Sequence, residues 1–193
     1  MDLTSSVRTD TLPALGSVLA PGALALAPYA GLLLMRHRGA AMFLASHEAT
    51  ALSIGAVLSI ASGFLIESVG SYVEYYLIDR RHPNRHAMLD AWWRYLRIAW
   101  TTEPTGQHYV RRILAVFKFE LNACVASVAA LPGLLWIAGT GLLGAGTSIA
   151  LVLAAVVAAV YLFHAATQTS LLLATIREQL LKGVGEPPFT ATQ

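Results

Sequence analysis

Long apolar stretches without a charged side chain dominate the chain, at residues 11–35, 49–66 and 121–176. A membrane-spanning helix needs about 20 consecutive apolar residues, so the first two stretches can each provide one crossing and the third can provide two. Within the third stretch, Pro132-Gly133 and a glycine-rich segment at 139–146 interrupt the apolar pattern. We therefore expect one helix to end near Ile137 and the next to begin near Thr147, which gives about four transmembrane helices.

No proline interrupts residues 41–81, so the sequence predicts one continuous second helix over this segment. A helix of roughly 40 residues is about 60 Å long, twice the thickness of the hydrocarbon core. Its C-terminal part would stand outside the bilayer and end before Pro83, because proline disfavours helical geometry in the preceding residue. A short helix at 87–100 and a third long helix from Gln107 would complete the extensions outside the membrane.

The composition agrees with a membrane protein, because 56% of the residues are hydrophobic, only 12% are charged and the mean hydropathy is +0.59. Soluble domains contain about 25% charged residues. The expected fold is all-α, a polytopic membrane protein with helical cytoplasmic extensions. Its expected parts are an N-terminal transmembrane part at 1–66, a basic, Trp-rich cytoplasmic region at 67–119, a transmembrane hairpin at 120–176 and a cytoplasmic tail at 177–193.

Positive charge is concentrated between the second and third predicted spans. Residues 68–119 contain eight Lys or Arg against four acidic residues, whereas the net charge of the whole chain is only +2. The positive-inside rule assigns this region to the cytoplasm, so the uncharged turn at 138–146 faces outside and the C-terminal tail faces the cytoplasm. Arg36-His37-Arg38 conflicts with this orientation, because strict alternation places it outside. A re-entrant first segment, which its prolines would permit, removes the conflict but changes the number of spans.

Small and polar residues recur at three- and four-residue steps along the second helix, which places them on one face. The third helix carries a matching polar face, so we expect Lys118 or Arg112 to pair with Glu67 or Glu74, whereas Glu120 lies on another face and needs its own partner. Two interpretations stay open: the polar side chains either hold the helices together or line an aqueous path. In so small a protein such a path would form between subunits, so we expect a homo-oligomer. The candidate pore-lining or intramembrane polar residues are Ser59, Gly63, Glu67, Glu74, Lys118 and His164.

Arginine and tryptophan alternate in residues 80–100, RRHPNRHAMLDAWWRYLRIAW. The arginine fork binds phosphate in a bidentate way and aromatic side chains stack on bases, so this mixture is typical of a nucleotide or single-strand binding surface. The competing interpretation is a headgroup belt that anchors the helices to anionic lipid. The candidate ligand-binding residues are Arg80, Arg81, Arg85, Trp92, Trp93, Arg94, Arg97, Arg111 and Arg112.

Enzyme motifs are scarce. Arg81-His82-Pro83-Asn84-Arg85-His86 resembles the Arg-His-x-x-x-His catalytic motif of HEPN ribonucleases over these six residues only, and the resemblance would place Arg81 and His86 at a cleaved phosphodiester. Pro83 breaks the helix on which that motif should lie. No zinc or di-iron spacing, phosphate loop, nucleophile elbow or dinucleotide fingerprint occurs, and the single Cys124 excludes a disulfide within one chain. We expect no catalytic residue, no metal and no cofactor.

In size, span count and basic cytoplasmic surface, the chain resembles the small four-helix membrane effectors of bacterial anti-phage nucleotide-signalling systems, although it carries no family motif. The resemblance implies an oligomeric channel or pore in the bacterial inner membrane. Its partners would be the lipid bilayer, further copies of the chain and a nucleotide or single-stranded oligonucleotide, with a soluble partner protein as a further candidate. The alternatives are a non-conducting partner, immunity or scaffold subunit and, less favoured, a membrane-bound hydrolase that uses Glu67, Glu74 and His86.

Overall fold

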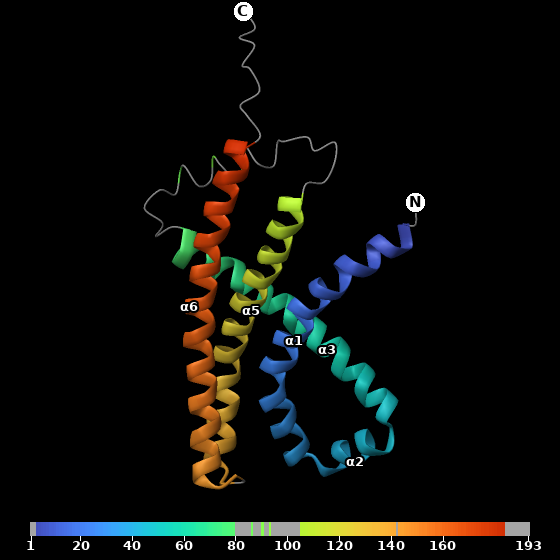
Figure 1. Ribbon diagram of the computed structural model, residues 1–193. Coiled ribbons are helices and arrows are strands. Elements are labelled where there is room, and N and C mark those ends of the chain that lie inside the picture. The colour runs from blue at the N-terminus through green and yellow to red at the C-terminus, as the bar shows by residue number, and fades with distance from the viewer. Residues whose placement is uncertain are drawn as a thin grey trace, which may run out of the picture.

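A computed structural model describes residues 3–79, 86, 90, 93, 105–141 and 143–183. Its elements are α1 (Leu3–Arg36), α2 (Arg38–Ser46), α3 (Glu48–Val73), the π-helical turn η1 (Glu74–Asp79), α5 (Thr105–Gly139) and α6 (Ala145–Gly183) (Figure 1). Every regular element in these ranges is helical, which confirms the all-α prediction.

Four helices of the described ranges are long and apolar enough to cross a membrane. Their candidate spans are Gly16–Arg36, Glu48–Tyr76, Tyr109–Gly139 and Ala145–Ile176. The predicted number of helices able to span a membrane is therefore confirmed, and this set of helices fits a multi-pass membrane protein. The predicted boundaries of the last hairpin are also close, since α5 ends at Gly139 and α6 begins at Ala145.

The helices have two common ends (Figure 1). At the end that we call the turn end, α1 and α5 finish and α3 and α6 begin. At the opposite end α3 and η1 finish and α5 begins. We call it the connector end, after residues 80–104, which separate η1 from α5 in the sequence. Helix α5 is the central element, because 50% of its most apolar stretch is buried, compared with 11% in each of α3 and α6.

Two small apolar clusters hold the bundle together. One joins α5 and α6 toward the connector end and is built around Phe117, Leu121 and Ala166, with Val73 of α3 packed against it. The other joins Ala25 of α1, Ile66 of α3 and Ala126 of α5. Side-chain burial thus ties the other three long helices to α5.

Helices α1 and α3 cross in direct main-chain contact. A methyl group added at Gly22 would lie 1.8 Å from the Ser59 carbonyl oxygen, and one added at Gly63 would lie 2.2 Å from that of Val18. Only glycine leaves room for two backbones at this separation. Below this crossing the two helices diverge toward the turn end, where α2 spans the gap between them (Figure 1).

Several hydroxyl side chains within the candidate spans donate to carbonyl oxygens of their own helix. Ser53 donates to Ala49, Ser127 to Ala123 and Thr167 to Phe163, each four residues earlier. Ser68 and Thr175 follow the same pattern. These hydroxyl groups therefore need no partner from a neighbouring helix or from water.

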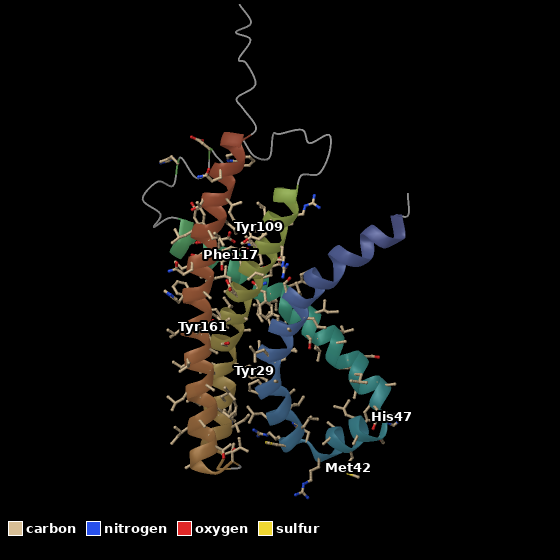
Figure 2. All side chains as sticks on the ribbon, viewed as in Figure 1. Tyr29, Met42, His47, Tyr109, Phe117 and Tyr161 are labelled. Carbon is tan, nitrogen blue, oxygen red and sulfur yellow. The ribbon has the colours of Figure 1, made fainter. Side chains whose placement is uncertain are left out.

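The predicted continuous helix over 41–81 is wrong at its N-terminal end, because His47 separates α2 from α3 (Figure 2). The Phe43 carbonyl accepts a hydrogen bond from Ser46 Oγ and lies 3.0 Å from His47 Nδ1. These side chains occupy the acceptor that a continuing helix would offer to the His47 amide, which turns instead to Leu44. The helix thus breaks because side chains compete with the His47 amide for the Phe43 carbonyl. The absence of proline from this segment does not reveal such a competition.

The first span forms part of one helix, α1, which does not reverse direction between Leu3 and Arg36. Helix α1 changes direction part-way along (Figure 1), as helices that contain proline commonly do. Of the predicted short helix at 87–100, only Asp90 and Trp93 are described, and both are helical. The remaining residues of that prediction lie outside the described ranges.

We expect Gly63→Ala to lower the free energy of unfolding by about 1–3 kcal/mol, because the added methyl group would meet the Val18 main chain and push α1 away from α3. Gly55→Ala on the same helix is the matched control, since nothing lies within 4 Å of its added methyl group. It should be neutral or stabilising by up to about 1 kcal/mol. Circular dichroism of the purified protein during denaturation in detergent measures both. Equal effects of the two substitutions would contradict the close crossing.

Candidate functional site

An ion pair joins α3 and α5 near the connector end. Lys118 Nζ of α5 lies 2.5 Å from Glu74 Oε2, at the start of η1, and the two side chains are 28% and 25% exposed. An isolated charge is costly to bury in an apolar environment, and an opposite charge at contact distance offsets that cost. The structure therefore selects Lys118 and Glu74 from the predicted pairings.

Asn122, one turn further along α5, joins that helix to α1 and reaches α3. Its Nδ2 donates to the Ser17 carbonyl at 3.3 Å, and the residue is 1% exposed. Its Oδ1 has no hydrogen-bond partner among the described residues and faces Gly70, where an added methyl group would lie 2.6 Å from it. Weak Cα–H···O contacts are common where helices cross, and the Asn122 carboxamide oxygen lies against the Gly70 main chain at such a crossing.

Glu120 provides the contact with the last helix. Thr169 Oγ1 of α6 donates to Glu120 Oε2 at 2.8 Å. This separate partner confirms the expectation that Glu120 lies on another face from Lys118. The half-buried carboxylate thereby gains a hydrogen bond across the contact between α5 and α6.

Together these side chains form a polar layer, defined as Ser17, Glu74, Lys118, Glu120, Asn122 and Thr169. Residues 118–122 span only about 6 Å along the axis of α5. From Glu120 to the end of α5 at Gly139 the helix is about 30 Å long, which equals the thickness of the hydrocarbon core. A bilayer that meets the turn end at residues 140–144 would therefore have its other surface close to the polar layer.

The other residues predicted to line a path are dispersed. Gly63 is buried beneath Val18, Ser59 and Glu67 are half-buried, and His164 is exposed on α6. Gly63 thus packs against α1 and cannot line a path through a single chain. The helical spacing of the sequence places Asn122 on the same polar face as Lys118, although it is not among the predicted site residues. It is an amide inside a charge-free apolar stretch, and that position is the signal that would have added it to them.

The predicted ligand-binding residues are described only in part. Arg111 and Arg112 are exposed on α5, about two turns before Lys118, and Trp93 is 56% exposed. The other six lie outside the described residues: Arg80, Arg81, Arg85, Trp92, Arg94 and Arg97. Of the HEPN-like pair, only His86 is described, and it is exposed.

Aromatic side chains gather at the same end. The rings of Tyr72 and Tyr76 lie 4.3 Å apart and those of Tyr75 and Tyr76 lie 4.9 Å apart, all at the end of α3 and the start of η1. Exposed tyrosines are enriched where a span meets the membrane surface. Within the described ranges, no group of three His, Cys, Asp or Glu is arranged to hold a metal ion.

Comparison with protein-family models, curated proteins and solved structures gives no match for this chain.

We expect Glu74→Gln to lower the free energy of unfolding by about 1–3 kcal/mol, because it leaves the Lys118 ammonium half-buried without its counter-charge. Lys118→Met should have a similar effect. The double variant Glu74→Gln/Lys118→Met should be more stable than either single variant, since neither charge is then stranded. Glu48→Gln, exposed at the turn end, is the control and should change little. Denaturation in detergent gives the four values, and additive effects would contradict the pairing.

Proposed function

We propose that the chain is the subunit of an oligomeric membrane channel whose conducting path lies between copies and is controlled by a phosphate-bearing ligand at the connector end. The observation that carries this proposal is the outward position of polar side chains on α6. His164 and Gln168 are exposed, whereas Ala159, Ala166 and Leu173 on the opposite face are buried. Polar side chains in a span usually face protein or water rather than lipid, so these residues favour a further surface beside α6.

The interior of the single chain supports a path between copies rather than through one copy. Close packing fills the crossings at Gly22, Gly63 and Gly70. Helix α5 also occupies the centre of the four long helices, where a water-filled axis would have to lie. Any continuous aqueous route therefore has to use surfaces that more than one copy supplies.

Control by a ligand follows from the position of the charges. Residues 80–104 connect η1 to α5, and the Glu74–Lys118 ion pair links the same two helices at the point where they enter the bundle. A polyanion that bridges arginines before and after this link would favour whichever arrangement of α3 and α5 brings those charges together. Such a ligand acts on the path only if the open and closed arrangements differ in their affinity for it.

The resemblance to anti-phage effectors suggests a nucleotide or oligonucleotide as the ligand and a bacterial inner membrane as the location. The concentration of positive charge in 68–119 supports a cytoplasmic connector end and cytoplasmic C-terminus. Arg36 and Arg38 would then be on the outer side, against the general rule. Their positions on either side of the corner at His37, next to the short helix α2, would let both reach lipid phosphates there.

A non-conducting membrane partner, such as an immunity or scaffold subunit, is the second candidate. The burial of Gly63 beneath Val18 and the contact of Gly70 with Asn122 favour it, because they give the small-residue face of α3 a packing role. In that case the tryptophans and arginines of 80–100 would anchor the chain to lipid headgroups.

Ion flux from liposomes that contain the purified protein tests the channel directly. We expect flux to change when cyclic nucleotides or short oligonucleotides are added on the connector side. His164→Leu should reduce the flux severalfold, because it replaces a polar group at the outward face of α6, whereas Thr167→Val on the same helix should not, since Thr167 is bonded to its own helix. If the folded protein gives no ion flux under any condition, the channel proposal is wrong and the non-conducting partner becomes the better assignment.

Ligand binding has its own test. The double variant Arg111→Ala/Arg112→Ala should weaken oligonucleotide binding about tenfold or more at low salt, where phosphate contacts contribute most. Arg36→Ala/Arg38→Ala removes the same charge from the turn end and is the matched control. Titration with a fluorescently labelled oligonucleotide measures both affinities. If both double variants lose the same affinity for the oligonucleotide, the loss reflects only the change in net charge. Arg111 and Arg112 would then not be ligand-binding residues.

A further inference from the structure

Glu67 is a carboxylate inside a candidate membrane span, and the described chain gives it no partner. It belongs to the span Glu48–Tyr76, and its side chain is half-buried. Within the described ranges it makes no hydrogen bond and no ion pair, whereas Glu74, two turns further along, is paired with Lys118. A carboxylate without a partner is costly in apolar surroundings, so a group of this kind inside a span points to a function.

Helical geometry directs Glu67 toward α5. Seven residues make nearly two turns, so Glu67 leaves its helix on the same side as Glu74, which contacts α5 through Lys118. Asn122 lies one turn beyond Lys118 on α5 and faces Gly70 of α3. Gly70 is in turn only three residues from Glu67. Asn122 therefore presents its carboxamide to the turn of α3 that carries Glu67.

The side chains of Glu67 and Asn122 are close enough to meet. Asn122 Oδ1 lies 2.6 Å from the position that a Cβ atom would take at Gly70. Cβ atoms three residues apart on a helix are about 5–6 Å from each other, which puts Oδ1 within about 8 Å of Cβ of Glu67. The Glu67 carboxyl group extends beyond that Cβ, and an O–H···O hydrogen bond spans about 2.7 Å. A rotation of the Glu67 side chain can therefore bring the two groups together.

A hydrogen-bond donor is what both groups lack. Asn122 is 1% exposed, its Oδ1 has no partner among the described residues, and its Nδ2 already donates to the Ser17 carbonyl. An ionised Glu67 offers only acceptors, but a protonated carboxyl group has one O–H donor. A single proton on Glu67 would thus supply the donor that Oδ1 needs and remove a charge from the span.

We propose that Glu67 and Asn122 form a proton-binding site between α3 and α5. Glu67 holds the proton on one carboxyl oxygen, and this O–H donates to Asn122 Oδ1. Proton release leaves a carboxylate that has no donor at Oδ1, so α3 loses this link to α5. The site makes the packing of α3 on α5 sensitive to pH, and it does not depend on whether the protein conducts ions.

The neighbouring charged groups are already engaged. On α5, Lys118 is paired with Glu74, and Glu120 is bonded to α6 on another face. The part of α1 that packs here, residues 16–25, contains no titratable side chain. Among the described residues at this crossing, Glu67 is therefore the group whose charge can change without breaking an existing contact.

Infrared spectroscopy tests the site, because a protonated carboxylic acid has a C=O stretching band that an ionised carboxylate lacks. The protein is placed in liposomes of ether-linked lipids, which have no carbonyl group of their own. Glutamates in water are ionised at neutral pH. We expect the band at neutral pH in the wild-type protein, its loss in Glu67→Gln, and its retention in Glu120→Gln and Glu48→Gln. Absence of the band from the wild-type protein, or its persistence in Glu67→Gln, would overturn the proposal.

The hydrogen bond to Asn122 has its own readout, since the frequency of this band depends on the hydrogen bonds of the acid group. Asn122→Leu removes the acceptor and should shift the band. Ser127→Ala is the matched control and should leave the band in place, because Ser127 is bonded to its own helix. Gly70→Ala, which would displace Oδ1, repeats the test if Asn122→Leu does not fold, as judged by circular dichroism. An unshifted band in the folded variant would refute the two-residue site.

Discussion

Lys118, Glu120 and Asn122 occupy a single turn of α5, and each makes its side-chain contact with a different spanning helix: α3 at Glu74, α6 at Thr169 and α1 at Ser17. In apolar surroundings the alternative to such a contact is a charge or an amide without a partner, which is expensive. Apolar packing alone would tolerate sliding and rotation of one helix on another. The polar turn of α5 therefore fixes the register of the other three helices, and their remaining contacts follow from it.

The positions of the glycines determine how much of α3 packs against the other helices. At Gly22, Gly63 and Gly70 the backbones come close enough that α3 is held by α1 and by Asn122 of α5. Gly31 and Gly55, which lie toward the turn end, have no such neighbour. The same helix α3 is thus packed against α1 and α5 toward the connector end and exposed toward the turn end.

Much of this architecture follows from the sequence. The charge-free stretches predict the four candidate spans, because length and hydropathy constrain a span strongly. The glycines from Gly139 onward place the last hairpin closely, whereas Pro132 lies inside α5 and ends no helix. The break at His47 escaped prediction, since it depends on two side chains competing for one carbonyl. Spacing placed Gly63 on the same face as Glu67 and Glu74 but could not tell whether that face met water or α1. The polar role of Asn122 required knowing that Ser17 and Gly70 would be its neighbours.

The self-bonded hydroxyl groups of Ser53, Ser127 and Thr167 bear on how the protein is made. A helix whose hydroxyls are already satisfied can enter the lipid by itself, without waiting for a neighbour to supply an acceptor. Biogenesis can then proceed in two stages, with each span inserting independently and the helices associating afterwards. Lys118, Glu120 and Asn122 lack this independence, because their partners Glu74, Thr169 and Ser17 lie on other helices. A newly inserted α5 would therefore depend on helices that precede it and follow it in the chain.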